Sequence, residues 1–258
     1  MDSVNKTLYI PLYGKAYVSE KGIILEDKKA EEIWEKAGFE LKGKAASKWL
    51  AYTMAMRSKV FDEWVKEKMT DDCVVLHLGC GLDSRVLRVN ASCQWYDLDF
   101  KNVIQERRKY FEETDTYHML EADLRLQDWI KELPSDKKAI VIMEGVSMYI
   151  SCLEMNQLFM TLKNYFGEVE LLLDYYSEFA AKVSKYKNPI NEVGVTKVYG
   201  INDPAVLNKM KFVCAHDMTP EYLIKELPEK EQKLFRRLYA GKFAKSLYRM
   251  AEFSGKRF

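Results

Sequence analysis

Residues 73–100 read CVVLHLGCGLDSRVLRVNASCQWYDLDF and decide the fold class of this chain. The run 74–78 is almost continuously apolar, which is typical of a strand that helices cover on both faces of a parallel sheet. Gly79 and Gly81 follow it, then comes a helical segment, and residues 93–98 form a second strand. Glycines directly after such a strand let a nucleotide-like ligand approach the backbone. The stretch therefore predicts a ligand-binding βαβ unit.

The glycine-rich turn and the acid after it indicate the kind of ligand. Asp99 lies 20 positions after Gly79, where a Rossmann-type unit presents an acid to ribose hydroxyls. Ser84 stands where the dinucleotide fingerprint has its third glycine, which permits close packing under a pyrophosphate. An adenosyl ligand without a pyrophosphate fits at least as well, and this points to S-adenosylmethionine. A nicotinamide-dependent dehydrogenase is the competing class of enzyme.

Length and composition favour a single α/β domain over residues 1–258. We expect an N-terminal helical lid over residues 1–69 and a Rossmann-like core over residues 70–258, with an inserted cap segment near residues 177–210. Apolar residues make up 48% of the chain, enough for a large core. The formal charge of +1 provides no field for nucleic acid or an anionic membrane, so neither partner is expected.

The five cysteines are odd in number and lack C-x-x-C spacing, so neither a disulfide framework nor a zinc site is predicted. Reduced thiols are typical of a cytosolic protein. The first residues lack a basic stretch followed by an apolar run, which disfavours a secretory signal. Apolar runs are also too short for a membrane span. We expect a cytoplasmic protein.

The segment before the sheet contains two predicted helices. Residues 8–17 include Pro11, so irregular backbone is expected there. A helix should run from Asp27 to a C-cap at Gly38. Residues 44–69 predict a long amphipathic helix with Arg57 on its apolar arc. A buried guanidinium needs an anionic partner, either a ligand carboxylate or an acid of the chain itself.

The rest of the chain predicts five more strands. They are expected at residues 118–120, 139–143, 169–174, 211–216 and 247–253, with helices at 103–111, 153–166 and 220–227. Glu144 follows one of these strands and should lie at the ligand edge of the sheet. Seven strands with the last two as a hairpin are the methyltransferase version of the doubly wound sheet.

Several motifs together resemble the leucine carboxyl methyltransferase family, and more closely its bacterial branch of polyketide O-methyltransferases. The matching pieces are LYIPLYGKA, AMRSKVFDEWV, VVLHLGCGLDSRVLRV, WYDLDFKNVIQERRKYF, EADLR and AIVIMEGVSMYIS. They follow the family's order and cover roughly residues 7–175. The resemblance implies a class I S-adenosylmethionine-dependent methyltransferase with a Rossmann-like, seven-stranded, mostly parallel sheet.

The resemblance implies that eight residues contact the cofactor: Lys15, Arg57, Gly79, Gly81, Asp99, Asp123, Leu124 and Glu144. In this interpretation Arg57, assisted by Lys15, pairs with the methionine carboxylate. Glu144 contacts the cationic amino end. The two glycines leave room for the methionine moiety.

The family pattern also assigns the nucleoside half of the cofactor. Asp99 accepts both ribose hydroxyls, and Asp97 is the alternative because the strand offers two acids on one face. Asp123 meets the adenine amino group, and Leu124 lies against the ring. Replacing Arg57 or Asp99 with alanine is expected to weaken cofactor binding at least about tenfold while the fold survives.

The sequence says less about the molecule that accepts the methyl group. A carboxylate needs no base, whereas a phenol commonly needs His or Lys. All three histidines fall inside predicted strands, which favours a carboxyl acceptor. Tyr149 is the first candidate for orienting it and Arg85 the second, although Arg85 can instead brace the glycine turn. Tyr13 and Tyr17 can line the pocket from the lid.

The predicted function is therefore S-adenosylmethionine-dependent O-methylation of a small-molecule carboxylate or phenol. Two alternatives remain. One is methylation of a protein C-terminal carboxyl group. The other is a methyltransferase-fold protein that binds the cofactor without turnover. No catalytic residue and no metal is assigned, and the sequence makes no prediction of oligomeric state.

Overall fold

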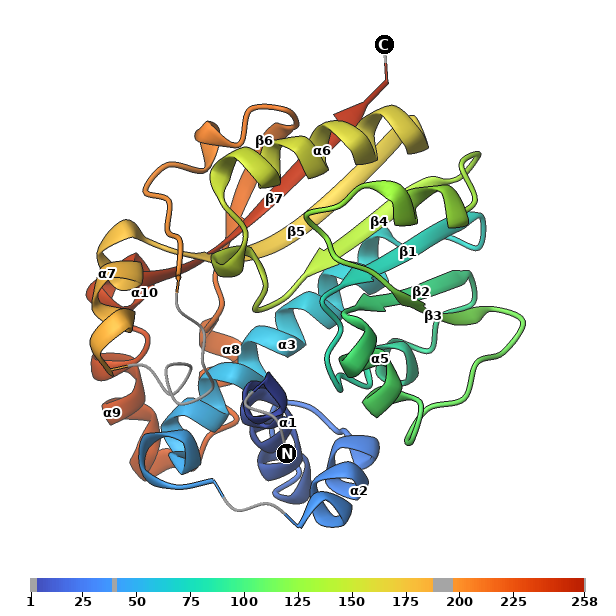
Figure 1. The fold of residues 1–258 in the computed structure, drawn as a ribbon. Helices are drawn as coiled ribbons and strands as arrows, with labels where there is room; N and C mark the ends of the chain where they lie inside the picture. The colour runs from blue at the N-terminus through green and yellow to red at the C-terminus, as the bar shows by residue number, and fades with distance from the viewer. Residues whose placement is uncertain (1–3, 39–40, 188–196, 258) are drawn as a thin grey trace.

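The computed structural model describes residues 4–38, 41–187 and 197–257, in which a seven-stranded sheet lies between two layers of helices (Figure 1). The strands are β1 (Cys73–Leu78), β2 (Gln94–Asp99), β3 (Tyr117–Glu121), β4 (Lys138–Met143), β5 (Glu168–Tyr176), β6 (Lys211–His216) and β7 (Tyr248–Lys256). Their order is β3-β2-β1-β4-β5-β7-β6. Strands β1 to β5 are parallel, and β7 is antiparallel to both its neighbours. The predicted fold class is confirmed.

Strand β1 is buried along its whole length because its alternating side chains enter two separate cores. Val75 joins the core on the side of the N-terminal helices. Val74, Leu76 and Leu78 join the core on the opposite face. The nearly continuous apolar run in the sequence therefore identified the centre of the sheet.

Helices and short 3-10 turns connect the strands. The first half of the chain contains α1 (Val4–Glu20), α2 (Lys28–Ala37), η1 (Gly43–Ala46), α3 (Lys48–Lys68), α4 (Arg85–Val89), α5 (Lys101–Arg107) and η2 (Asp128–Glu132). The second half contains η3 (Ser147–Tyr149), α6 (Cys152–Phe166), α7 (Glu178–Lys187), η5 (Pro204–Val206), α8 (Glu221–Ile224), α9 (Glu229–Leu238) and α10 (Lys242–Leu247). Among the described residues, no helix has the length and apolar character needed to cross a bilayer.

The prediction of irregular backbone at residues 8–17 is wrong, because α1 runs straight through Pro11. A proline inside a helix removes a hydrogen bond. Close packing on α3 offsets this loss, since a Cβ on Gly14 would lie only 3.1 Å from the Cβ of Met54. Tertiary contact thus overrides the local helix-breaking signal.

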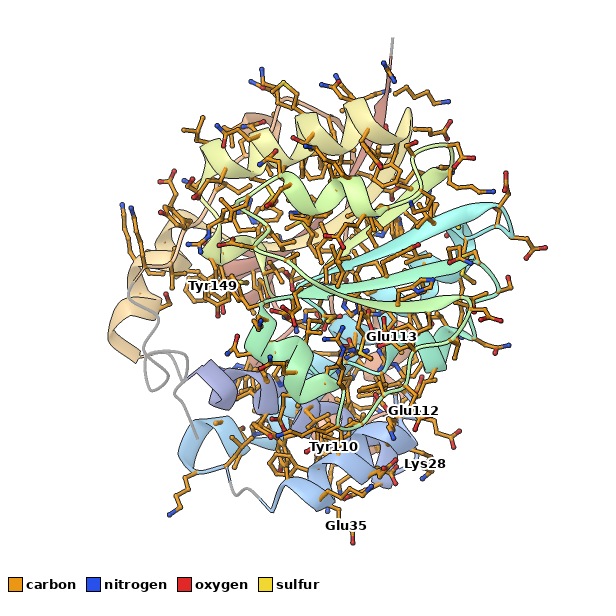
Figure 2. The ribbon with its side chains drawn as sticks, turned by 45° about the vertical axis from the view of Figure 1, so that its right-hand side comes forward. Lys28, Glu35, Tyr110, Glu112, Glu113 and Tyr149 are labelled. Carbon is orange, nitrogen blue, oxygen red and sulfur yellow. The ribbon has the colours of Figure 1, made fainter. Side chains whose placement is uncertain are left out.

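Helix α2 matches its prediction at both ends. The Asp27 carboxylate caps the helix by accepting a hydrogen bond from the backbone N–H of Ala30 at 2.8 Å. Gly38 ends it with a left-handed φ of 58°. Lys28 and Glu35 lie on its exposed surface, at the end of the molecule away from Tyr149 (Figure 2).

Helix α3 differs from the expected amphipathic helix, because it is buried around most of its circumference. Its buried side chains include Ala51, Ala55 and Ser58 as well as the predicted apolar arc. The reason is its position between the sheet and α1 (Figure 1). A helix covered on two sides has no wide polar face.

The C-terminal third departs most from the sequence-based expectations. Strands β6 and β7 do pair, but α8, α9 and α10 separate them along the chain, so they are not a tight hairpin. Only α8 was predicted. The predicted cap segment contains α7 and η5, and residues 188–196 of it lie outside the described residues.

Candidate active site

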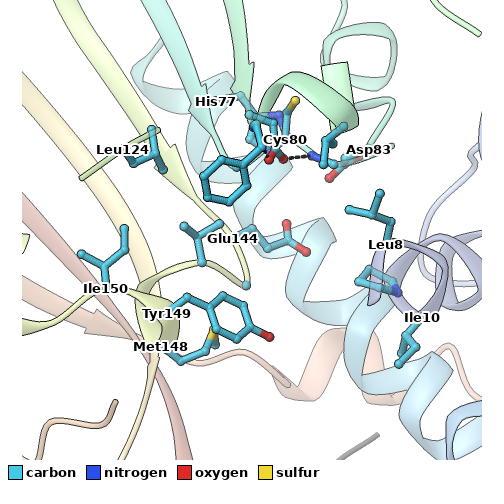
Figure 3. A pocket seen from close by; sticks show the side chains of 18 of the residues that line it. Leu8, Ile10, His77, Cys80, Asp83, Leu124, Glu144, Met148, Tyr149 and Ile150 are labelled. Atoms are coloured by element: carbon cyan, nitrogen blue, oxygen red, sulfur yellow. Dashed lines mark hydrogen bonds between the residues drawn. The ribbon is translucent and has the colours of Figure 1, made fainter. Parts of the chain in front are cut away.

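A cavity of about 700 Å³ lies at the carboxyl ends of β1, β2 and β4 (Figure 3). Turns after these strands form one wall. Helices α1 and α3 supply the other wall, from residues including Leu8, Ile10, Lys15, Leu50, Met54 and Arg57. Open α/β sheets bind ligands in this position, outside the carboxyl ends of the strands. The cavity is therefore where the predicted βαβ unit would hold its ligand.

The glycine turn after β1 contributes backbone to the cavity. Gly79 and Gly81 have φ values of 72° and 52°, in the left-handed region that glycine adopts without strain. The Gly79 N–H donates to the carbonyl oxygen of Leu98 at 2.7 Å, which ties the turn to β2. A Cβ on Gly79 would lie 2.2 Å from Cγ2 of Val146. Only glycine fits at position 79.

Asp97 on β2 is fully buried and surrounded by donors. It accepts hydrogen bonds from the Trp95 indole at 2.8 Å and the Tyr117 hydroxyl at 2.7 Å. It also forms an ion pair with Arg107. Burial by itself would raise the pKa of Asp97, but Arg107 and His77 outweigh it and lower that pKa. The Asp97 carboxylate is thus occupied within the core.

Asp99, two positions further along β2, lines the cavity. Its carboxylate accepts hydrogen bonds from the backbone N–H groups of Gly81 at 2.9 Å and Phe100 at 2.7 Å. Burial raises the pKa of Asp99, against the effect of these two hydrogen bonds. Each carboxylate oxygen has a second lone pair. Asp99 can therefore accept further hydrogen bonds from a ligand, whereas Asp97 cannot reach one.

Arg57 also lines the cavity, but it already has anionic partners. Its Nε lies 3.0 Å from Glu144 Oε1, and one terminal nitrogen lies 3.0 Å from Asp174 Oδ2. The same nitrogen donates to the Tyr248 hydroxyl. The alternative of an internal ion pair is therefore present in the structure. Arg57 has five N–H groups, and these contacts together with a second contact to Glu144 use four of them. With respect to the described residues, one N–H on the other terminal nitrogen is available to a ligand.

Glu144 follows β4 and lies in the middle of the cavity wall (Figure 3). Besides Arg57, it accepts a hydrogen bond from the Ser58 hydroxyl at 2.7 Å and pairs with Arg85. Burial would raise the pKa of Glu144, but Arg57 and Arg85 outweigh it and lower the pKa to about 2. Glu144 is therefore an anion at neutral pH.

Lys15 on α1 lines the cavity and is almost fully buried, with its ammonium 3.2 Å from Asp83 Oδ2. Arg85 does not line the cavity. It is fully buried, with its Nε 2.6 Å from Asp62 Oδ1. One of its terminal nitrogens lies 3.3 Å from Asp83 Oδ2 in the turn after β1, a position compatible with the alternative role of bracing that turn. The predicted role in acceptor binding does not agree with this position.

Asp123 and Leu124 lie beyond β3, on the side of the cavity next to Asp99. The Asp123 carboxylate is held by its neighbour Arg125, whose Nε donates to it at 2.8 Å. Leu124 is buried and offers an apolar surface. The two side chains thus provide an acid and an apolar surface at the same end of the cavity.

Of the predicted acceptor tyrosines, only Tyr149 lines the cavity. Its hydroxyl points into the open space (Figure 3), and burial raises its pKa. It has no hydrogen-bond partner within the described part of the chain. Tyr13 and Tyr17 instead pack against each other with tilted rings, their centroids 5.7 Å apart, outside the cavity lining.

Sequence reasoning missed several cavity residues from the C-terminal third. They are Tyr176, Lys197, Tyr199 and Tyr248, with Asp174 behind them. The acid at Asp174 ends the predicted fifth strand and so carried a usable signal. No local pattern marks Tyr248, because its contact with Arg57 depends on β7 pairing with β5.

Fold, cavity and the ionised groups around it define a class I S-adenosylmethionine-dependent methyltransferase. The sequence profile described as leucine carboxyl methyltransferase matches residues 6–163, and the chain belongs to that family. It is 26% identical to the tetracenomycin polyketide synthesis O-methyltransferase TcmP of Streptomyces glaucescens, over 80% of this chain and 78% of that protein.

Solved structures agree on the fold. A candidate methyltransferase from Thermobifida fusca YX superposes with a TM-score of 0.58 at 13% identity, covering 95% of this chain and 94% of the other. Magnesium protoporphyrin IX methyltransferase (ChlM) from Synechocystis PCC 6803, with bound S-adenosylhomocysteine, gives a TM-score of 0.52 at 13% identity. It covers 94% of this chain and 100% of the other.

The cavity fits the cofactor that this class uses. A carboxylate with free lone pairs, an apolar leucine beside it and two glycines without side chains lie along one wall. The volume is within the range of small-molecule sites. At the opposite end, ionised Glu144 and Arg57 lie side by side in the lining, which suits the ammonium and carboxylate groups of the cofactor's amino acid end.

Proposed function

We propose that this enzyme methylates a carboxylate oxygen of a small, largely apolar molecule, with S-adenosylmethionine held along the glycine-turn wall of the cavity. The observation that carries the proposal is that one cavity joins Asp99 and Glu144 to the hydroxyl of Tyr149. The proposed cofactor ligands are Lys15, Arg57, Gly79, Gly81, Asp99, Asp123, Leu124 and Glu144. The cofactor supplies an electrophilic methyl group on sulfur.

The protein's main task in such a reaction is alignment. An in-line displacement needs the acceptor oxygen, the methyl carbon and the sulfur in one line. Asp99 would hold the ribose at one end, and Glu144 would hold the cationic amino acid end. Contacts at both ends would limit how the cofactor could rotate. The acceptor then has to approach from the α1 and α3 side of the cavity.

A carboxylate acceptor agrees with the lack of a free histidine among the described cavity residues, where Lys197 remains as a possible base. His77 is the histidine that lines the cavity, and both its nitrogens are engaged. Nδ1 lies 3.1 Å from Asp97 Oδ1 and Nε2 lies 3.2 Å from Arg85. His118 and His216 lie elsewhere in the sheet. A phenol would therefore have no histidine to deprotonate it, whereas a carboxylate is already ionised.

The remaining walls suggest how the acceptor is held. Leu8, Ile10, Leu50 and Met54 offer apolar contact to the body of the acceptor. Because burial raises the pKa of Tyr149, its hydroxyl stays protonated and can donate a hydrogen bond to a carboxylate. Lys197 at the cavity lining adds a positive charge, with its ammonium 4.9 Å from the centroid of the Tyr199 ring.

Calorimetric titration with S-adenosylmethionine, S-adenosylhomocysteine and NAD tests the cofactor. We expect both adenosyl ligands to bind and NAD not to bind. Acceptor chemistry is then tested with matched trios of an aromatic carboxylic acid, its amide and the corresponding phenol, following release of S-adenosylhomocysteine. Turnover of phenols alone would contradict the carboxylate proposal. Failure of both adenosyl ligands to bind would contradict the cofactor site.

The contacts of Arg57 change the effect expected of one predicted substitution. Arg57→Ala would leave Asp174 as a buried carboxylate without its cation and Glu144 with Arg85 alone, at a cost of about 3–5 kcal/mol. The expectation that the fold survives this substitution is therefore revised. Asp99 has no such buried cationic partner, so its variants report on ligand binding with less disturbance of the fold.

We also propose a cytoplasmic location and a small-molecule partner rather than a protein or nucleic acid. The near-neutral charge and the cavity volume support the small-molecule partner. The free cysteines support the location. TcmP is, by its name, a polyketide O-methyltransferase, which is consistent with a small acceptor. Cell fractionation tests the location. Faster methylation of a peptide with a free C-terminus than of small acids would contradict the proposal of a small-molecule acceptor.

A further inference from the structure

Away from the cavity, three potential metal ligands of different chemistry meet on the sheet. Cys214 and His216 are two positions apart on the edge strand β6, so their side chains share one face. Glu252 on β7 stands directly opposite Cys214 in the antiparallel register. Opposite residues of an antiparallel pair also share a face. Strand pairing therefore brings thiol, imidazole and carboxylate together.

The distances between these groups match those of ligands around one ion. Cys214 Sγ lies 3.5 Å from His216 Nε2 and 3.6 Å from Glu252 Oε2. With zinc bonds of about 2.3 Å to sulfur and about 2.0–2.1 Å to nitrogen and oxygen, tetrahedral angles separate sulfur from either lighter ligand by about 3.5–3.6 Å. Both contacts of Cys214 are thus already at the required separation.

The third separation is shorter, because the imidazole and carboxylate are hydrogen-bonded. His216 Nε2 and Glu252 Oε2 lie 2.7 Å apart, whereas ligands of a tetrahedral zinc ion would be about 3.3–3.4 Å apart. A metal ion would replace the shared proton and separate the two atoms by about 0.6 Å. His216 is partly exposed, so its ring has room to make this movement.

The carboxylate is already oriented for such a role. Glu252 is buried, and Lys68 of α3 holds its other oxygen, Oε1, at 3.0 Å. Oε2 is thereby directed at the histidine and the cysteine, as outer-shell partners direct ligands in metal sites. Cys214 is exposed, so an ion can enter from solvent and keep one position open.

We propose that Cys214, His216 and Glu252 bind a divalent transition metal ion, Zn²⁺ being the best match. Thiolate and imidazole ligands select such ions over Mg²⁺ or Ca²⁺. None of the three residues lines the cavity, so the site is separate from methyl transfer. Its effect would be to bind the edge strand β6 to β7, and its fourth position would hold water.

Cobalt substitution tests the site on untagged full-length protein. We expect one Co²⁺ per chain and a thiolate-to-cobalt absorption band in the near ultraviolet. Cys214→Ser should abolish the band. Cys152→Ser is the matched control, since Cys152 is also an exposed thiol but lies outside the cluster, and this variant should keep the band. Zn²⁺ should displace the cobalt.

A second measurement separates a built site from loose surface binding. Zn²⁺ should raise the melting temperature of the wild type but not of Cys214→Ser or His216→Asn, because an ion stabilises only a fold that binds it. Absence of the band in the wild type at excess Co²⁺, or its persistence in Cys214→Ser, would overturn the proposal. An equal zinc shift in His216→Asn would also overturn it.

Discussion

Strand β2 carries two aspartates on one face, Asp97 inside the strand and Asp99 two positions later at its carboxyl end. Asp97 is enclosed by Arg107, Tyr117 and Trp95 and is fully buried. Asp99 lines the cavity and bonds only backbone N–H groups. Two aspartates on one face of β2 therefore have different surroundings: Asp97 is packed in the core, and Asp99 faces the cavity.

The two aspartates differ in whether the protein provides an internal cation for the carboxylate. Arg107 from α5 neutralises Asp97, and the positive charge of Arg107 lowers the Asp97 pKa. No cationic side chain bonds Asp99 in the described structure, and its pKa is raised. An acid without an internal cation at the carboxyl edge is available to hydroxyl donors on a ligand.

The largest effect is expected from Asp97→Asn. This change keeps the shape of the side chain but leaves the Arg107 guanidinium buried without its anion. Removing one partner of a buried pair costs about 3–5 kcal/mol of the free energy of unfolding. Urea denaturation would measure it. A loss below about 1 kcal/mol would show that the two aspartates do not differ in structural role.

Asp99→Asn is expected to give a smaller effect of a different kind. Affinity for S-adenosylhomocysteine should fall at least tenfold, about 1.4 kcal/mol, because a neutral amide accepts ribose hydroxyls less strongly. The free energy of unfolding should change less than in Asp97→Asn. Glu121→Gln is the matched control, since Glu121 ends the neighbouring β3 in register with Asp99 but does not line the cavity. Unchanged affinity in Asp99→Asn would remove Asp99 from the site.

The smallest expected effect is in the pH dependence of binding. The raised pKa of Asp99 means that acidification protonates it at a higher pH than an ordinary aspartate, so cofactor affinity should fall there. Glu144, with a pKa of about 2, stays ionised over the same range. Calorimetric titrations over a pH series should show this slope in the wild type and a flatter one in Asp99→Asn. Equal slopes in the two proteins would contradict the assignment.

The two acids also differ in the sign of their effect on stability. The lowered pKa of Asp97 contributes stability above its unfolded-state pKa, and this contribution is lost as the pH falls through the folded-state pKa. The raised pKa of Asp99 favours folding at low pH, and that contribution is lost as the pH rises through its folded-state pKa. Acid unfolding should therefore be governed by Asp97 and similar paired acids rather than by Asp99.

Much of the ligand edge was predictable because its signals are local. Gly79 and Glu144 directly follow β1 and β4, Gly81 lies in the same turn as Gly79, and Asp99 ends β2. The carboxyl ends of parallel strands meet at one edge. All eight predicted cofactor residues line the cavity. The acceptor side was less predictable, since Tyr17 and Arg85 lie outside the lining and Tyr176, Lys197 and Tyr199 were not anticipated.

The sequence by itself determined the doubly wound sheet, its glycine turn and the acids at its edge, because strand periodicity and turn chemistry act over a few residues. Only the tertiary structure decided which groups neutralise one another. Pairing of β7 with β5 brings Tyr248 to Arg57, and pairing with β6 brings Glu252 to Cys214 and His216. Such contacts join residues far apart in the chain, and no local pattern encodes the burial and charge compensation that select them.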